Sequence, residues 1–399
     1  MLSEQAVPVV RATLPAVAGS LDRITERFYA RLFDAHPELL RDLFNRGNQA
    51  NGEQRRALAG ALAGSLAAFA GALLDRPDAR PDALVNRIAH KHASLGVTSE
   101  QYKTVHEHLS AAITEVLGDA VTPEVARAWD EVYWLMANAL IAVESRLYQE
   151  AGTAEGEVWR TLRIAARREE THDTVSFLLE QPDGSAPGAF RPGQYVGVRV
   201  LLPDGARQTR QYSLSSAPGL PHWRITVKRA DGDPAGEVSS WLLAHTRAGE
   251  FLEVSVPFGD LVLPEGDGPL LLASAGIGST PFLAMLGRLA ATGSTRRVVV
   301  VHADRSPAAH AHAGELRRHV DALPHGSLHL WYEEPGGTEA RAGRVDVRAL
   351  DLPEGLTAYL CGPLPFMRAV RGDLLALGTD PADVHYEVFG PDLWLGAEG

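Results

Sequence analysis

A glycine turn between an apolar run and a helical segment is the first feature of the chain that could bind a ligand. It lies in LLLASAGIGSTPFLAML, where Gly276 and Gly278 let the backbone turn sharply and Pro281 suits the first turn of a helix. The free amide groups at the start of such a helix suit a pyrophosphate. The turn lacks the full GxGxxG pattern, so by itself it fits a purely structural turn equally well.

Three further segments carry side chains suited to flavin or nucleotide binding. In RQYS, alternation along a strand places Arg210 and Tyr212 on one face, where arginine can grip a phosphate and tyrosine can stack on a flat ring. YLCGPLPFM, residues 359–367, ends a buried run with a Gly-Pro turn, at the edge where parallel sheets bind ligands. HYEVFGP, residues 385–391, places Phe389 near the C-terminus, where its ring could cover a flavin. Each segment also has an ordinary explanation, namely a surface arginine, a tight turn or core packing.

Two histidines in the N-terminal part stand in apolar helical stripes, and either could ligate haem iron that receives the flavin's electrons. His92 shares a helical face with Ile88 and Leu95. His106 stands in an equally apolar stripe that includes Tyr102. Spacing alone leaves both histidines open, and a core histidine satisfied by hydrogen bonds is the commoner role for either.

The elements that must position these residues fall into three regimes. Residues 1–149 indicate an all-α domain, with helices expected over Leu21–Phe33, Gln54–Leu74, Ala83–Leu95, Ser99–Val116 and Pro123–Tyr148. Residues 156–263 contain short β-type runs punctuated by Gly, Pro and Asp, which predicts an antiparallel β-barrel domain. Residues 267–399 alternate buried strands with helices, the pattern of an α/β parallel-sheet domain.

Composition excludes several classes of protein. The net charge of −12, without a basic block, argues against nucleic acid and anionic membranes as partners. No apolar run approaches the about 18 residues that span a bilayer, and the N-terminus lacks the features of a secretory signal. Cys361 is the only cysteine, which excludes an intrachain disulfide and fits a reducing compartment. We therefore expect a cytoplasmic protein, with no stable membrane insertion and no obligate protein partner evident.

Taken in order, the motifs of the C-terminal half resemble the ferredoxin–NADP reductase superfamily over about residues 156–391. The resemblance implies an FAD site and a site for NADH or NADPH. The cofactor-binding residues that it implies are Tyr195, Arg210, Gln211, Tyr212, Ser213, Gly236, Val238 and Ser239; Gly276, Ile277, Gly278, Ser279, Thr280 and Pro281; Cys361, Gly362 and Pro363; and Val388, Phe389, Gly390 and Pro391. After the next buried strand, Asp304 favours NADH because an acid there can bond the ribose hydroxyls, whereas Arg305 could hold a 2′-phosphate.

The N-terminal segments ERFYARLF, LFNRGNQANGEQRRAL, AHKHASLGV, SEQYKTVHEHL and ESRLY resemble, in order and spacing, the globin domains of bacterial flavohaemoglobins. That resemblance places the proximal iron ligand at His92 and the distal tyrosine at Tyr29. The other site residues that it implies are Phe44 against the haem, Gln54 and Leu58 in the distal pocket, Tyr102 and Glu144 bonded to the proximal imidazole, and Lys91 and Glu387 near the haem and flavin edges.

The combined resemblance implies a nitric oxide dioxygenase that uses NAD(P)H electrons, passed through FAD and haem b, to convert NO and O₂ to nitrate. The same scaffold would also suit an NAD(P)H oxidase or an alkyl hydroperoxide reductase, and the sequence does not separate these activities. An oxygen-storing or oxygen-sensing globin is a further alternative, but a carrier needs no electron supply. Two positions depart from the family pattern: Val388 stands where relatives often have cysteine, and Ser279 replaces a common glutamine.

Overall fold

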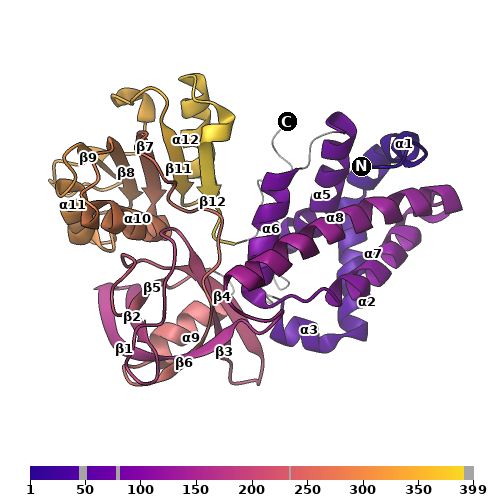
Figure 1. Cartoon of the computed structure of the whole chain (residues 1–399), viewed down its shortest axis with the longest axis horizontal. Helices are drawn as coiled ribbons and strands as arrows, with labels where there is room; N and C mark the ends of the chain where they lie inside the picture. The colour runs from indigo at the N-terminus through magenta and orange to yellow at the C-terminus, as the bar shows by residue number, and fades with distance from the viewer. Residues whose placement is uncertain (45–51, 78–80, 233–234, 391–399) are drawn as a thin grey trace. The chain divides into compact units, whose positions relative to one another are not determined.

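The computed structural model describes residues 1–44, 52–77, 81–232 and 235–390, and leaves aside the side chains of residues 52–63. The chain forms two compact units (Figure 1). The first, here the helical unit, contains the described residues of Met1–Trp159 together with Arg199–Arg210 and Gly390. The second, here the sheet unit, contains Arg160–Val198 and Gln211–Phe389.

The helical unit contains every helix that the sequence periodicity predicts. Its elements are α1 (Ala6–Ala18), α2 (Leu21–Ala35), α3 (Pro37–Asp42), α5 (Gly52–Asp75), α6 (Asp82–Leu95), α7 (Gln101–Leu117), the short 3₁₀ turn η1 (Gly118–Ala120) and α8 (Pro123–Glu150). Helices α1 and α3 are additional to the prediction. Helix α1 contains Pro15, which obscures its helical signal because proline usually ends a helix.

Helix α8 shows how local sequence fixes these elements. The Thr122 hydroxyl accepts a hydrogen bond from the Val125 amide at 3.3 Å, and Pro123 occupies the first turn, so the helix start is defined. Its buried residues recur every three or four positions, from Trp129 to Tyr148, and form one long apolar stripe. None of the helices in the described ranges is both long and apolar enough to cross a membrane.

A six-stranded sheet with the strand order β4-β3-β6-β1-β2-β5 follows the helices; most of it belongs to the sheet unit, whereas the end of β3 and the first half of β4 fall within the helical unit. Its elements are β1 (Trp159–Thr171), β2 (Thr174–Glu180), β3 (Tyr195–Leu201), β4 (Arg207–Ser213), β5 (Trp223–Lys228), helix α9 (Glu237–His245) and β6 (Phe251–Ser255). Strand β2 pairs antiparallel with both β1 and β5, and Phe177 lies opposite Ile225 in the core. The six runs predicted as strands all form strands, and the predicted antiparallel fold is confirmed.

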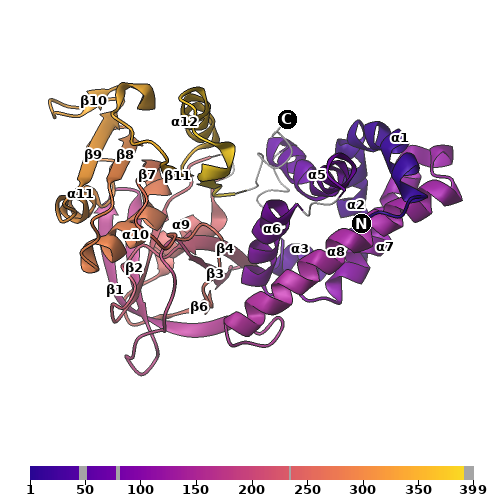
Figure 2. The ribbon, with the colours of Figure 1, turned by 45° about the horizontal axis from the view of Figure 1, so that its top comes forward.

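The second part of the sheet unit is a sheet with the order β10-β9-β8-β7-β11-β12, in which every pair of neighbouring strands is parallel. Its elements are β7 (Leu270–Ala275), η2 (Gly276–Ser279), α10 (Thr280–Ala291), β8 (Val298–Asp304), α11 (Ala313–Asp321), β9 (Gly326–Tyr332), β10 (Arg341–Ala342), η3 (Val347–Ala349), β11 (Thr357–Cys361), α12 (Leu364–Ala376), η4 (Pro381–Asp383) and β12 (Val384–Glu387). Leu270 and Leu272 share a buried core with Phe282 of α10 and Val320 of α11. Helices α10 and α11 therefore cover the same face, while α12 runs beside β11 (Figure 2). The predicted α/β fold is confirmed.

A buried pair of histidines lies near the carboxyl end of β8, with His302 in the strand and His310 in the segment that follows it. The rings of His302 and His310 stack with their centroids 3.9 Å apart, and His310 Nδ1 lies 2.8 Å from the Tyr332 hydroxyl. Burial, and next the neighbouring His302, lowers the pKa of His310 to about 2. His310 is therefore neutral in the folded chain over the whole range in which an unfolded histidine takes up its proton.

This pKa shift predicts a pH-dependent loss of stability. Below the ordinary histidine pKa of 6.5, the unfolded chain binds a proton at His310 that the folded chain does not, so the free energy of unfolding falls as pH falls. Between pH about 6.5 and about 5.5 the expected loss is about 1 kcal/mol. Urea unfolding at the two pH values should show this slope in the natural chain and a smaller one in His310→Gln. His245→Gln, at an exposed position, is the control; an equal slope in the His310 variant would contradict the assignment.

Candidate functional site

His92 lies on α6 with its imidazole held by side chains from two other helices. Its Nδ1 is 2.9 Å from Glu144 Oε1 on α8 and 2.9 Å from the Tyr102 hydroxyl on α7. The Tyr102 phenol in turn donates to Glu144 Oε1 at 2.5 Å. Glu144 is only 2 % exposed, and a carboxylate so deeply buried requires such donors. The predicted residues His92, Tyr102 and Glu144 are thus brought together.

This arrangement leaves the other nitrogen of His92 available. The Glu144 carboxylate can only accept, so it fixes the imidazole proton on Nδ1 and leaves a lone pair on Nε2. Nε2 has no hydrogen-bond partner among the residues that the structure describes, and the side chain is 32 % exposed. Burial, and next the charge of Glu144, raises the pKa of Tyr102, so that its phenol stays a proton donor. A histidine with one nitrogen on a carboxylate and the other free fits an axial haem ligand.

His106, the other candidate, has a different environment. Its Nε2 is 2.6 Å from Asp130 Oδ1, in a partly exposed ion pair. Its ring packs against Tyr133 and Trp134, with centroid distances of 4.9 and 5.2 Å. The contacts therefore favour His92 over His106 as the iron ligand, a choice that helical spacing leaves open.

Tyr29 lies on α2 in an aromatic cluster. Its ring stacks on Phe33 at 5.3 Å between centroids and meets Phe44 edge-on at 5.7 Å. The residue is 8 % exposed, and within the described ranges its hydroxyl makes no hydrogen bond. Burial raises the pKa of this phenol, so it keeps its proton. Tyr29 is thus a buried donor without a partner, beside the phenylalanine that the resemblance places against haem.

Four other predicted residues remain, Gln54 and Leu58 of the distal pocket and Lys91 and Glu387 of the haem and flavin edges. Gln54 and Leu58 belong to α5, but their side chains lie outside the described residues. Lys91 is on α6 in the helical unit, whereas Glu387 ends β12 in the sheet unit. Glu387 is in register with Cys361 of β11, and burial, followed by the charge of Glu387, raises the pKa of the Cys361 thiol.

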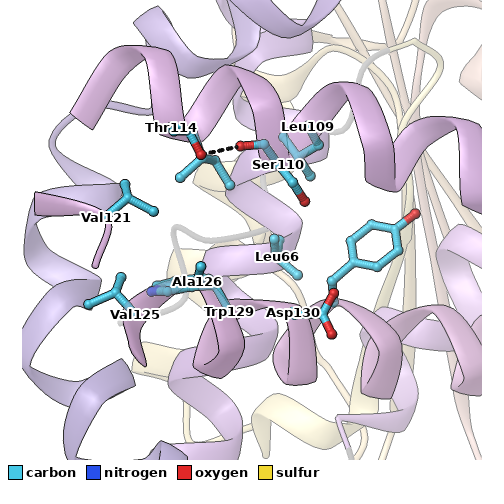
Figure 3. Close-up of a pocket in the computed structure, with 11 residues that line it drawn as sticks. Leu66, Leu109, Ser110, Thr114, Val121, Val125, Ala126, Trp129 and Asp130 are labelled. Atoms are coloured by element: carbon cyan, nitrogen blue, oxygen red, sulfur yellow. Dashed lines mark hydrogen bonds between the residues drawn. The ribbon is translucent and has the colours of Figure 1, made fainter. Parts of the chain in front are cut away.

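A separate hollow of about 60 Å³ lies in the helical unit among α5, α7 and α8 (Figure 3). Leu66, Leu109 and Trp129 line it with buried apolar surface, and the Thr114 hydroxyl donates to the carbonyl of Ser110 at 2.9 Å at its side. None of the predicted site residues lines it.

In the parallel sheet, two glycine turns meet where the strand order reverses. The chain runs outward from β7 to β8 and β9, and then returns to β11 on the other side of β7. The carboxyl ends of two strands that diverge in this way form the usual ligand crevice of an open α/β sheet. The predicted nicotinamide residues occupy these ends: Gly276, Ile277, Gly278, Ser279, Thr280 and Pro281 after β7, and Cys361, Gly362 and Pro363 at the end of β11.

The two turns touch through their backbones. A Cβ atom on Gly278 would lie 2.3 Å from the carbonyl oxygen of Cys361. A Cβ atom on Gly362 would lie 3.0 Å from the amide nitrogen of Ala275. Only glycine permits this approach, and the turn leads through η2 directly into the start of α10, with Pro281 in its first turn. The start of a helix after a glycine turn is a common binding place for a dinucleotide pyrophosphate.

The predicted flavin residues lie on β3, β4 and the start of α9. On β4, Gln211 is exposed, Arg210 and Tyr212 are half-buried and Ser213 is buried. Tyr195 begins β3, 5 % exposed. The alternation expected for RQYS is therefore present, with Arg210 and Tyr212 in similar environments.

The start of α9 is another close backbone approach. A Cβ atom on Gly236 would lie 2.7 Å from both Ala230 Cβ and Ser239 Oγ, and Ser239 accepts a hydrogen bond from the Ala230 amide at 3.1 Å. Val238 is buried in the same turn. The start of α9 is therefore a tightly packed turn at a helix N-terminus, the kind of place that suits a phosphate-bearing cofactor.

The residues after β12 are described as far as Gly390, whereas Pro391 lies outside the described residues. Val388 and Phe389 directly follow the strand. Phe389 is 46 % exposed, unusual for a large aromatic side chain. An exposed ring at the end of a parallel strand fits a residue that covers a flat ligand.

Asp304 and Arg305, the residues expected to distinguish NADH from NADPH, both contact other groups of the protein. The Asp304 carboxylate is 4 % exposed and accepts a hydrogen bond from the Arg305 amide at 2.8 Å. The Arg305 guanidinium lies 3.3 Å from Asp173. Both side chains are thus engaged within the protein, so NADH over NADPH stays a prediction.

Two tyrosines that the sequence analysis did not single out hold main-chain groups near His92. The Tyr133 phenol donates to the carbonyl of Tyr102, and the Tyr148 phenol donates to the carbonyl of Val97, each at 2.6 Å. A sequence signal for Tyr148 exists, since it follows Glu144 by four residues and therefore shares its helical face.

Comparison with known families gives three matches in chain order. Residues 26–140 match the globin family, residues 161–262 the oxidoreductase FAD-binding domain, and residues 272–372 the oxidoreductase NAD-binding domain. The flavohemoprotein of Chromobacterium violaceum is 43% identical over 98% of both chains, and that of Bordetella pertussis is 42% identical over 98% of this chain and 99% of its own.

Two solved structures are also similar. Flavohemoglobin from Malassezia yamatoensis, with bound FAD and haem, is 37% identical, with a TM-score of 0.89 over 98% of this chain and 100% of its own. The FAD/NAD-binding domain of nitric oxide dioxygenase from Vibrio cholerae is 36% identical, with a TM-score of 0.55 over 58% of this chain and 99% of its own.

The contact between the two glycine turns predicts a sensitive position. Gly278→Ala should force β7 and β11 apart at their ends, because the new methyl group would overlap the Cys361 carbonyl. We expect a loss of about 1–3 kcal/mol in the free energy of unfolding, and weaker NAD(P)H binding in a titration of the holoprotein. Gly372→Ala is the control, since its Cβ would meet nothing within 4 Å on helix α12, and alanine there should stabilise by up to about 1 kcal/mol. Equal nucleotide affinity in the two variants would contradict the assignment.

Proposed function

The chain belongs to the flavohaemoglobin family, and from this premise we propose that it acts as a nitric oxide dioxygenase, using NAD(P)H electrons by way of FAD and haem b to convert NO and O₂ to nitrate. When bound, the flavin would divide a hydride into single electrons and the haem iron would take up dioxygen. Support for the cofactors comes from the FAD and haem bound in the Malassezia yamatoensis relative. Support for the activity comes from the name of the Vibrio cholerae relative.

His92 is the residue proposed to hold the iron, through Nε2. The Glu144 carboxylate and the Tyr102 phenol, both at 2.9 Å from Nδ1, would keep the ring in one orientation. A carboxylate on Nδ1 also makes the imidazole a stronger electron donor, as it does at other metal-ligating histidines. This proximal arrangement favours the binding and activation of dioxygen over simple storage.

The observation that carries the proposal is the hydroxyl of the buried residue Tyr29, which has no hydrogen-bond partner among the described residues. It would donate a hydrogen bond to the dioxygen substrate, in which negative charge develops. Such a bond to a charged group contributes about 1.5–3 kcal/mol, equivalent to about tenfold to hundredfold in oxygen retention. Phe33 and Phe44 pack around the phenol and limit the access of water to it.

The residues of the sheet unit would supply the electrons. The amides at the start of α10 would bind the dinucleotide pyrophosphate, and Phe389 would cover the flavin until the nicotinamide arrives. An oxygen carrier has no use for such a supply, which favours a turnover enzyme over the storage or sensing alternative.

A direct assay tests the activity. The full chain loaded with haem and FAD should consume NO in air with NADH or NADPH, and form nitrate. Because a nicotinamide carries two electrons and the iron accepts one, each nicotinamide oxidised should yield two nitrate ions. Without oxygen, nitrate formation should stop. A loaded preparation that oxidises NAD(P)H with O₂ or cumene hydroperoxide but forms no nitrate from NO would contradict the proposal in favour of an oxidase or hydroperoxide reductase.

A conservative variant tests the distal donor. Tyr29→Phe keeps the aromatic cluster but removes the hydroxyl, so dioxygen should dissociate about tenfold to hundredfold faster in stopped-flow measurements on the reduced protein. The matched control is Tyr332→Phe, which removes a buried tyrosine hydroxyl from the sheet unit and should leave the rate unchanged. An unchanged rate in the Tyr29 variant would remove Tyr29 from the mechanism.

A further inference from the structure

Helix α8 contacts the region of His92 with two side chains that lie one turn apart. Glu144 reaches the imidazole, with Oε1 2.9 Å from His92 Nδ1. Tyr148 reaches the main chain, and its phenol donates to the carbonyl of Val97 at 2.6 Å. Tyr148 is 3 % exposed, so water competes little for this hydrogen bond. Burial, and next the charge of Glu144, raises the pKa of the Tyr148 phenol, which therefore remains a donor.

Val97 connects the Tyr148 phenol to the backbone of His92. Helix α6 ends at Gly96, whose left-handed backbone (φ 74°, ψ 33°) turns the chain so that the Val97 amide donates to the His92 carbonyl at 3.1 Å. Both main-chain groups of Val97 are therefore hydrogen-bonded: its amide donates to the His92 carbonyl, and its carbonyl accepts from the Tyr148 phenol. Two hydrogen bonds in series join the phenol to the main chain of His92.

The turn itself has little freedom. A Cβ atom on Gly96 would lie 3.0 Å from the carbonyl oxygen of Gly156, so the chain packs closely on both sides of the turn. Among the described residues, the hydrogen bond from Tyr148 joins the Val97 carbonyl to α8. Together with the His92–Glu144 hydrogen bond and the packing of α6 on α8, it sets the end of α6 relative to the helix that carries Glu144.

We propose that Tyr148 is a positioning residue for the iron ligand: by holding the Val97 turn it keeps the His92 imidazole at hydrogen-bond distance from Glu144. The inference rests on the proposed role of His92. Helix α8 thus holds His92 at two points: Tyr148 holds its main chain through Val97, and Glu144 holds Nδ1 of its imidazole. Loss of the Tyr148 hydroxyl would let α6 shift away from α8. The hydrogen bond between His92 Nδ1 and the Glu144 carboxylate would then lengthen, and the imidazole would become a weaker electron donor.

The test uses Tyr148→Phe in the full chain, which keeps the ring and removes the hydroxyl. In the reduced, haem-loaded protein, the iron–histidine stretching band in the resonance Raman spectrum should move to lower frequency and broaden. Transfer of haem to an apoglobin acceptor should be about twofold to tenfold faster, the range expected for one hydrogen bond. An unshifted band with an unchanged rate of transfer would overturn the inference.

A matched control separates positioning from general loosening of α8. Thr13→Val removes another hydrogen bond that ties α8 to a neighbouring helix, since the Thr13 hydroxyl accepts from Trp129 Nε1 at 2.9 Å. This variant should leave the iron–histidine band in place. Equal shifts in both variants would mean that α8 responds to any lost contact, and would also overturn the inference.

His92→Gly separates this inference from its premise. Its iron–histidine band should be absent and should return when free imidazole is added. If the band is present in the natural chain, absent in His92→Gly and unmoved in Tyr148→Phe, the role of His92 stands and that of Tyr148 fails. If His92→Gly keeps the band, the role of His92 fails first.

A measurement without haem keeps the proposal testable if Tyr148→Phe does not take up haem. Hydrogen exchange of the Val97 amide, which is bonded to the His92 carbonyl, should be about twofold to tenfold faster in Tyr148→Phe than in Thr13→Val. Equal protection of this amide in the two variants would overturn the inference.

Discussion

The buried carboxylate of Glu144 is the constraint on which the helical unit depends. A carboxylate that is 2 % exposed must find hydrogen-bond donors inside the protein, because no water replaces them. Its donors are Tyr102 on α7 and His92 on α6, so three helices must meet at one oxygen atom. If one donor were lost, the uncompensated group would cost about 1–3 kcal/mol. The same requirement that fixes the packing of α6, α7 and α8 therefore fixes the direction of the imidazole.

In the sheet unit, steric contact rather than a buried charge fixes the positions of the elements. Where β7 and β11 diverge, the ends of the two strands approach so closely that a single methyl group on Gly278 would overlap the Cys361 carbonyl. The two turns can approach each other because Gly278 and Gly362 have no side chains. In the helical unit, by contrast, the buried Glu144 carboxylate brings the helices together. The result is a helix start after a glycine turn, suited to a pyrophosphate and insensitive to the replacement of a neighbouring side chain such as Ser279.

The fold and part of the candidate site follow from sequence because their causes are local. Helical periodicity depends on residues three and four apart, which is why α2, α5, α6, α7 and α8 are all predicted. Alternation and turn residues likewise predict the six strands β1–β6. Helix α1 is absent from the prediction because Pro15 interrupts its pattern. The glycines at which two backbone segments approach closely can be recognised in the sequence as a motif. The sequence does not show, however, that Gly278 packs on Cys361.

By itself, the sequence determined the three structural regimes, the glycine turns and the two histidines that could hold iron. Helical spacing left those histidines open and the family resemblance selected His92; the tertiary structure favours the same choice, since it places Glu144, 52 residues along the chain, on His92 Nδ1 and Asp130 on His106 Nε2. Only the tertiary structure showed that the Asp304 side chain is buried and accepts a hydrogen bond from the Arg305 amide. The physical reason is the same in each case. Spacing along a chain reports which residues share the face of one helix or strand, whereas a hydrogen bond between distant residues is decided by how those elements pack.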